Sequence, residues 1–323
     1  AHELGEQLLK IAQRQQDPAL LLVAHRALGD TLIWLGEFAL AREHLEQAIT
    51  LYNPRQHRIL AFLYGRDAGV LGLCYASLAL WLLGYPDQAL RRVNEALMLA
   101  QELSHPFSLA HALIFAALLH YFRREGLVAQ ERAEAAIALA NEQKFPNWLA
   151  LGTIQRGWAL AEQGQVTEGI AQMRRGLAAS QSTGAKLGRS VFLAMLAEAC
   201  GEVVQTEEGF AVLDEALAVV DKSEEHVYEV ELHRLKGEMM LIQKADKTEI
   251  EACFHRAINI ARCQQAKSLE LRATVSLSRL WQKQDKKEEA RKLLLEIYGW
   301  FTEGFDTPDL QEAKALLEEL SSN

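Results

Sequence analysis

Cysteine and histidine occur once in this chain at a spacing that suggests metal chemistry, in the segment that contains Cys253, His255 and Cys263. Thiolate and imidazole groups are common ligands of Zn²⁺. On a helix, however, Cys253 and His255 are two positions apart and face different ways, and no second pair accompanies them. The sequence therefore predicts no metal site here, and it offers no residues for a cofactor.

Nucleophilic or acid–base catalysis would require other sets of residues. The Ser/His/Asp, Cys/His and paired-carboxylate combinations in the chain all fall at positions that helix packing or solvation explains. No segment matches G-x-x-x-x-G-K-[ST], the pattern of a phosphate-binding loop. We therefore predict that the protein is not an enzyme.

The charge and the cysteines bear on partners and compartment. The 323 residues carry a formal net charge of −9 that is spread along the chain, whereas a nucleic-acid binder would favour a basic stripe. None of the four cysteines forms a C-x-x-C pair, which fits buried free thiols in a reducing cytoplasm; they are Cys74, Cys200, Cys253 and Cys263. The chain starts Ala-His-Glu, with neither Met nor a signal-peptide pattern, so we expect a fragment of a longer protein.

One uncharged stretch, 68–86, is long enough to span a membrane. It holds the first helix of a repeat at the expected phase, and glycines dilute its hydrophobicity. We interpret it as a helix buried between neighbours, and we expect no membrane insertion.

Small residues recur along the chain at a fixed interval, and this recurrence indicates the helices on which the candidate side chains lie. One series is Gly29, Ser77, Ala117, Gly157, Ala197, Gly237 and Ser278. A second is Ala41, Ala89, Ala129, Gly169, Gly209, Ile250 and Ala290. A third, Ala48, Ala96, Ala136, Gly176, Ala216, Ala257 and Ile297, steps by 48, 40, 40, 40, 41 and 40 residues. Such a period is typical of a solenoid of helix pairs.

Each repeat reads as two amphipathic helices joined by a turn, with apolar residues at i, i+3, i+4 and i+7. No segment shows sustained alternation, so no sheet is expected. Small residues let paired helices cross closely: Gly29 would face Ala41, and Ala48 would receive the next unit.

The motif Leu28-Gly29-x-x-Leu32, then Ala41-x-x-x-Leu45, then Ala48 resembles the tetratricopeptide repeat, whose usual unit is about 34 residues. The resemblance implies an all-α, right-handed α-solenoid of about seven helix pairs, here with a period of about 40 residues. We expect a single superhelical domain over 1–323. It would contain a half-unit at 1–16, seven repeats at 22–307 and a capping helix at 308–321 with one polar face.

Several stretches resemble one bacterial group at the level of phrases: 61–70, 79–92, 104–113, 157–179 and 298–317. They are similar to the C-terminal repeat region of signalling proteins that join a class III adenylate/guanylate cyclase domain to an AAA-type, STAND-like ATPase. The resemblance implies a regulatory or partner-binding tail without the catalytic activity. It defines no ligand residues.

In tetratricopeptide arrays the first helices line the concave face. The matching stripe includes Arg26 and Asp30 in repeat one. In repeats two to four it carries aromatic residues, with Phe122 adjacent to it: Trp81, Tyr121, Phe122 and Trp158. These rings suggest either a groove for apolar partner segments or an inter-repeat core. In repeats five to seven the stripe turns polar, with Glu198, Glu231, Arg234, Glu238, Arg272, Arg279 and Gln282.

The eight extra residues between repeats one and two form a second candidate site. We expect an irregular loop over about 53–69, where function often lies in a regular array. Its arginines and tyrosine suggest an anion or acidic partner segment, or simply a solvated loop; the candidates are Arg55, Arg58, Tyr64, Arg66 and Asp67.

The sequence thus favours a cytoplasmic, non-catalytic scaffold for protein–protein interaction. Its partner would be a protein or peptide segment, or the upstream domains of its own parent chain. Two alternatives remain open: a small-ligand sensor like the repeat domain of maltose-type transcriptional activators, and a homo-oligomerisation module that forms a homodimer.

Overall fold

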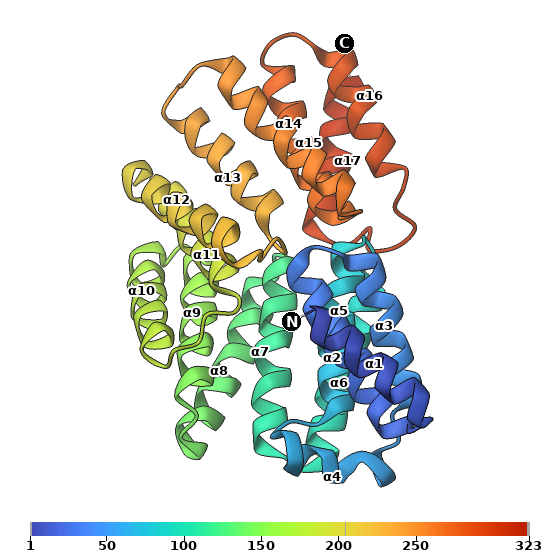
Figure 1. Ribbon diagram of the computed structural model, residues 1–323. Coiled ribbons are helices and arrows are strands. Elements are labelled where there is room, and N and C mark those ends of the chain that lie inside the picture. The colour runs from blue at the N-terminus through green and yellow to red at the C-terminus, as the bar shows by residue number, and fades with distance from the viewer. Residues whose placement is uncertain (1, 204, 322–323) are drawn as a thin grey trace.

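The computed structural model describes residues 2–203 and 205–321, and all regular elements in these ranges are α-helices (Figure 1). The expected all-α solenoid of helix pairs is confirmed. The helices are α1 (His2–Gln15), α2 (Pro18–Leu35), α3 (Phe38–Leu51), α4 (Pro54–Tyr64), α5 (Ala68–Leu82), α6 (Pro86–Leu103), α7 (Pro106–Phe122), α8 (Gly126–Gln143), α9 (Pro146–Glu162), α10 (Val166–Ser182), α11 (Arg189–Glu202), α12 (Thr206–Ser223), α13 (Glu229–Ile242), α14 (Lys247–Cys263), α15 (Lys267–Gln282), α16 (Lys287–Tyr298) and α17 (Pro308–Ser321).

The helices pair as the period predicts. The hairpins are α2–α3, α5–α6, α7–α8, α9–α10, α11–α12, α13–α14 and α15–α16, and the first helix of each packs on the first helix of the next. Helix α1 packs on α2 and α17 on α15 and α16, while Ala1 lies outside the described residues. The stack therefore places α5, α7, α9, α11, α13 and α15 side by side.

Local sequence signals set the helix ends. The Asp17 carboxylate accepts hydrogen bonds from the backbone N–H groups of Ala19 and Leu20, and Pro18 begins α2. The same helix ends at Gly36, whose φ of 83° is the left-handed conformation that glycine adopts without a side-chain clash. The Gly36 cap explains why the turn between α2 and α3 needs only residues 36 and 37.

The uncharged stretch at 68–86 contains α5, in which every residue is buried against α3, α6, α7 and α15. This agrees with its interpretation as an interior helix. Among the described helices, α2 is the one long and apolar enough to cross a membrane, and 33% of its 18 residues are buried. A single helix of this kind is weak evidence for a membrane span, since core helices share its composition.

Close helix crossings explain the small residues. A Cβ atom on Gly157 of α9 would lie 2.7 Å from the carbonyl oxygen of Gly169 on α10, and one on Gly169 would lie 2.5 Å from the carbonyl oxygen of Gly157. Gly176 meets α9 in the same way, with the Ile154 side chain 2.6 Å from its Cβ position. The repeated glycines thus set the distance between α9 and α10.

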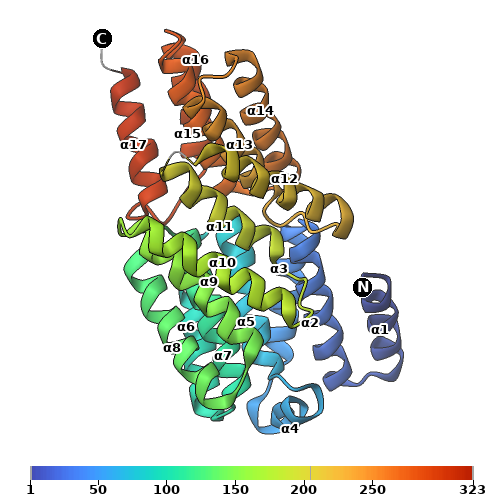
Figure 2. The same ribbon diagram turned by 90° about the vertical axis from the view of Figure 1, so that its left-hand side faces the viewer.

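The break in the period is a helix, which corrects the expected irregular loop. Helix α4 is capped by Asn53, whose side chain accepts a hydrogen bond from the Arg55 backbone N–H, and it ends at Gly65 with φ 73°. It packs on α5, its Phe62 ring meets the His105 ring edge to face, and it lies at the lower end of the molecule in two perpendicular views (Figures 1 and 2). The extra residues therefore add a peripheral helix while leaving the stacking of α2, α3 and α5 intact.

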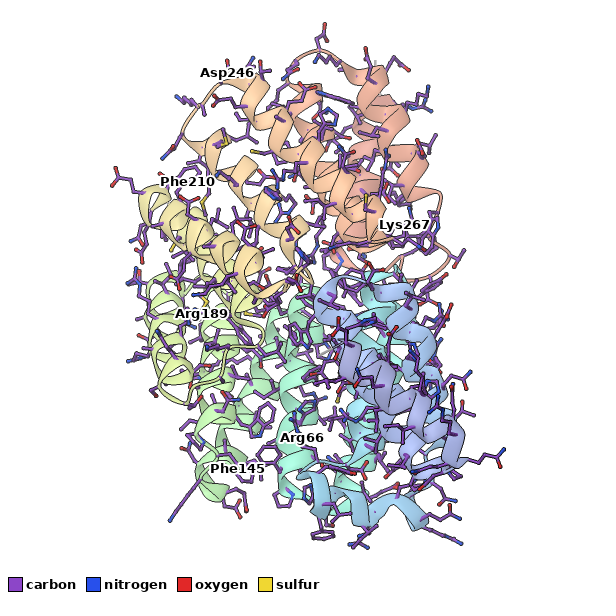
Figure 3. The ribbon with its side chains drawn as sticks, in the orientation of Figure 1. Arg66, Phe145, Arg189, Phe210, Asp246 and Lys267 are labelled. Carbon is purple, nitrogen blue, oxygen red and sulfur yellow. The ribbon has the colours of Figure 1, made fainter. Side chains whose placement is uncertain are left out.

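The superhelix closes on itself, which the repeat pattern did not predict. Helix α15 packs on α5, and the Ser268 hydroxyl donates a 2.5 Å hydrogen bond to the Trp81 carbonyl oxygen. The segment 299–307 reaches the start of α6, where Glu303 accepts 3.0 Å hydrogen bonds from the backbone N–H groups of Asp87 and Gln88. Lys267 at the start of α15 marks this junction in Figure 3. The last repeat thus lies against the second.

We predict that Gly157→Ala lowers the free energy of unfolding by about 1–3 kcal/mol, because the new methyl group overpacks the α9–α10 crossing. The matched control is Gly72→Ala in α5, where the nearest atom to the new Cβ, on Ile49, lies 3.5 Å away. Removing this helical glycine should leave stability unchanged or raise it by about 0.5–1 kcal/mol. Urea denaturation measures both, and equal effects of the two variants would contradict the close-crossing account.

Candidate functional site

The aromatic candidates lie in the interior. Trp81, Tyr121, Phe122 and Trp158 are each at most 3% exposed. The Trp81 ring stacks on Phe122 with centroids 4.7 Å apart, Phe122 stacks on Tyr228 at 5.2 Å, and Tyr121 meets Trp158 edge to face at 4.7 Å. The core interpretation therefore holds for the ring positions, because closure of the superhelix brings α13 and α15 over them.

Arg272 of α15 covers this aromatic cluster. Its guanidinium lies 5.0 Å from the centroid of the Trp81 ring and donates a hydrogen bond to the Phe122 carbonyl oxygen. Its Nε donates to Asp309 of α17 at 2.8 Å, and the side chain is only 9% exposed. One side chain thus joins α15 to α5, α7 and α17.

A cavity of about 240 Å³ opens beside Arg272. Its walls come from α11, α13, α15, α17 and the turn after α7, so it joins residues that lie far apart in the chain. The lining residues are Arg124, Glu198, Glu231, Arg234, Glu238, Leu271, Arg272, Val275, Ser276, Arg279, Asp309 and Glu312. Most of these side chains are charged, and we take this charged cavity as the candidate site.

Ion pairs organise the rim and the wall of the charged cavity. Arg124 and Arg279 each lie 2.7 Å from the Glu312 carboxylate. Deeper in the wall, Arg234 pairs with Glu231 at 2.6 Å. Burial acts to raise the pKa of Glu231, but Arg234 and Arg272 outweigh it and hold the pKa below its usual value. Glu231 is therefore ionised at neutral pH although it is 1% exposed.

Two polar atoms in the described part of the wall lack partners, and a neighbouring carboxyl has a raised pKa. Glu231 Oε2 and Arg234 Nε are buried without a hydrogen-bond partner among the described residues. Glu198 accepts a 3.1 Å hydrogen bond from the Trp158 indole N–H, and its pKa is raised by burial and then by the charge of Glu231. Buried polar groups normally have partners, so these atoms mark a place where a ligand can add contacts.

Sequence reasoning found part of the charged cavity without choosing it. Of the seven polar residues predicted on the concave stripe of repeats five to seven, six line the charged cavity, and Gln282 does not. The sequence missed Arg124, Asp309 and Glu312, which come from a turn and from the terminal helix. Their only signal was the polar face of the capping helix, because the closure that brings α17 to this place has no local pattern.

Arg26 and Asp30 form an ion pair with each other on α2 and do not line the charged cavity. Burial raises the pKa of Asp30 to about 6, although Arg26 and Arg66 act to lower it. The structure thus assigns these two candidates to the N-terminal half of the fold, apart from the cavity.

The candidates of the inter-repeat segment separate into two groups. Arg55, Arg58, Tyr64 and Arg66 are exposed, as expected for a surface site. Asp67 is fully buried: its side chain accepts hydrogen bonds from the Val70 N–H and the Tyr52 hydroxyl, and it caps α5. Asp67 is therefore unavailable to a partner, because capping and burial engage it within the fold.

All four cysteines are free thiols, but only two of them are buried, whereas the sequence suggested buried thiols throughout. Cys74 and Cys200 are buried, Cys253 is half-buried and Cys263 is exposed. Within the described ranges, no group of three or more His, Cys, Asp or Glu residues is placed to hold a metal ion. The Cys253 thiol lies 3.7 Å from the Met240 sulfur and contributes to packing.

Comparison with known proteins supports the fold. No protein-family model matches the chain. This chain is 22% identical over 280 residues to an uncharacterised protein of Rhizobium meliloti (strain 1021). The match covers 86% of this chain and 27% of that relative. The chain therefore spans only about a quarter of the length of the curated relative it matches.

Two solved structures share the architecture. A Rap protein complexed with competence and sporulation factor has a TM-score of 0.63 at 11% identity, covering 93% of this chain and 77% of that chain. Aspartyl phosphate phosphatase F from Bacillus subtilis has a TM-score of 0.54 at 12% identity, covering 91% and 74%. At these identities the likeness shows the fold alone, a tetratricopeptide-type solenoid.

We predict that Trp81→Ala lowers the free energy of unfolding by about 3–5 kcal/mol, because the ring is part of the core. The control is Tyr64→Ala, whose side chain is 57% exposed on α4 and should change stability by no more than about 0.5 kcal/mol. Urea denaturation reports both values. Near-wild-type stability of Trp81→Ala would mean that the ring faces an open groove after all.

Asp30 should make stability depend on pH. Its folded pKa of about 6 lies above the unfolded value of 3.8, so the fold favours the neutral carboxyl between these values, and stability falls as pH rises through this window. The full loss is roughly 3 kcal/mol. Asp30→Asn removes this titration, so the variant should gain stability relative to wild type between acid and neutral pH. Parallel stability profiles of the two proteins across that range would refute the shift.

Proposed function

We propose that this chain is a non-catalytic interaction scaffold that binds a protein or peptide segment at the charged cavity. The observation that carries the proposal is the convergence of charged side chains from α11, α13, α15 and α17 on one cavity, where two buried polar atoms have no partner among the described residues. A partner that supplies those hydrogen bonds would gain affinity and specificity, because unpaired buried polar groups are costly.

The comparisons add support from the architecture. The Rap protein, which shares this fold, was solved in complex with competence and sporulation factor. Solenoids of helix pairs commonly use their concave surfaces for recognition. A partner segment that lies along α11, α13 and α15 would reach the charged cavity from this surface.

We further propose that the chain is the C-terminal, partner-sensing part of a cytoplasmic bacterial signalling protein with cyclase and ATPase domains. The phrase-level resemblance supports this context, as does a relative of which the chain covers 27%. The partner would then be another protein or the upstream domains of the same chain. Binding would shift the population of arrangements of those catalytic domains.

The size of the charged cavity, about 240 Å³, also favours a second candidate, a sensor of a small charged ligand. In that case the ligand would raise the melting temperature of the isolated domain in proportion to its occupancy. A macromolecular partner would instead contact residues beyond the cavity rim.

We also propose that α4 contributes a separate contact with an acidic partner surface. No acidic residue lies between 53 and 66, and Arg55 and Arg58 are exposed beside large apolar side chains. Ile59, Phe62 and Leu63 are 61%, 70% and 69% exposed. Basic and apolar side chains on one surface helix are typical of a recognition element.

The test of the charged cavity reverses charges at its rim. Glu238 is 37% exposed and Arg279 54%, so Glu238→Lys combined with Arg279→Glu changes the rim and leaves the aromatic core in place. We expect loss of about tenfold or more of partner capture from a native-host lysate, quantified by mass spectrometry.

The matched control reverses an exposed ion pair on α10, Glu168→Lys with Arg175→Glu, whose side chains are 55% and 67% exposed. This variant should keep the partner. Equal capture by wild type, the rim variant and the control would show that the partner binds elsewhere and would refute the assignment to the charged cavity.

A further inference from the structure

We propose that the charged cavity accepts a cationic group, the guanidinium or ammonium of an arginine or lysine side chain in a partner segment. The inference rests on the proposed binding role of the cavity and adds the chemistry of what enters it. It follows from the charges in the lining, the pairs they form and one buried oxygen that no described group engages.

The lining holds one more acidic residue than basic. Its arginines are 124, 234, 272 and 279, four in number, and its acidic residues are 198, 231, 238, 309 and 312, five in number. An ion that enters a site of low dielectric is favoured when it balances the charge already there. One monovalent cation would bring this set to neutrality.

The ion pairs show where the uncompensated charge lies. Arg272 engages Asp309, and Arg124 and Arg279 both engage Glu312. Arg234 is shared by Glu231 at 2.6 Å and Glu238 at 3.5 Å. Glu198 forms no ion pair among the described residues, and its Oε2 is held by the neutral indole of Trp158. Glu198 is therefore the lining carboxylate that no described arginine pairs with directly, although the charges of Arg234 and Arg272 act on it.

A buried acceptor gives the second, independent observation. Glu231 is 1% exposed, lines the charged cavity and has no hydrogen-bond partner at Oε2 within the part of the chain that the structure describes. The charge of Glu231 acts on Glu198, since it contributes to the raised pKa of the Glu198 carboxyl. An incoming N–H donor would satisfy the free oxygen and relieve the repulsion between the two carboxylates.

An anionic group fits this place less well. It would meet Glu198 and Glu231, while Arg272 is already occupied by the Phe122 carbonyl oxygen and Asp309. Among the described lining residues, the one buried side-chain donor without a partner is Arg234 Nε, a single N–H group that the carbonyl oxygen of a peptide ligand would satisfy. The cavity thus combines carboxylate acceptors for a cation with one donor for a neutral oxygen.

The test uses ethylguanidinium as the probe and ethylurea as its neutral isostere, added to the full chain at equal ionic strength. The reporter is the Trp158 indole N–H resonance in a ¹H–¹⁵N spectrum, assigned with Trp158→Phe, because this group donates to Glu198. We expect a saturable shift with ethylguanidinium and none with ethylurea.

Glu198→Gln keeps the size and an oxygen acceptor but removes the charge, and it should weaken ethylguanidinium binding by about tenfold or more. Glu168→Gln, an exposed carboxylate on α10, is the control and should bind as wild type. Unfolding of Glu198→Gln would show as a change in the whole spectrum, and the wild-type comparison of the two probes then still decides the inference.

Equal shifts with ethylguanidinium and ethylurea, or equal affinity of Glu198→Gln and wild type, would overturn the cationic assignment. So would saturable binding of acetate in place of ethylguanidinium, which would leave the charged cavity standing as a binding site. The rim reversal of Glu238 and Arg279 tests the proposed function separately, because it reports on partner capture without assuming the charge of the bound group.

Discussion

The buried guanidinium of Arg272 is the contact on which the closed form of this solenoid depends. A charge removed from water is costly unless it is paired and hydrogen-bonded on all sides. Arg272 meets this requirement with the Trp81 ring, the Phe122 carbonyl oxygen and Asp309. These groups come from α5, α7 and α17, so the charge is satisfied only when the last repeat lies against the second and third.

Closure divides the concave side into two parts. In the first half, the rings that an open superhelix would expose are stacked beneath Arg272 and Tyr228 and serve as core. In the second half, α11, α13 and α15 keep their charged side chains around the cavity, and α17 adds Asp309 and Glu312. The side chain that closes the fold therefore also forms part of the wall of the charged cavity.

This arrangement changes how a signal would travel. In an open array each repeat contacts only its neighbours, and its stability is close to a sum of local terms. Here a ligand near Glu231 would act on Arg272, which contacts α5 and α7 directly. Binding at the proposed site would thus be coupled to packing in the N-terminal repeats without passing through every pair between them. Helix α4 lies at the end of the molecule, away from the contacts that Arg272 makes (Figure 2).

The sequence by itself determined the repeating features. The interval between Gly29, Gly157 and their equivalents predicts helix pairs because close crossings need small residues wherever they recur, and Asp17-Pro18 marks a helix start because capping is a local interaction. The polar stripe from Glu198 to Arg279 could also be predicted, because its residues occupy equivalent positions in successive repeats. The helix at 54–64 also carries local signals, Asn53-Pro54 at its start and Gly65 at its end, although the break in the period suggested a loop. Tertiary structure alone decided that Trp81 is core and that Asp309 and Glu312 complete the charged cavity. The curvature that brings α15 and α17 back onto α5 and α7 accumulates from small rotations at every repeat, and no short stretch of sequence specifies that sum.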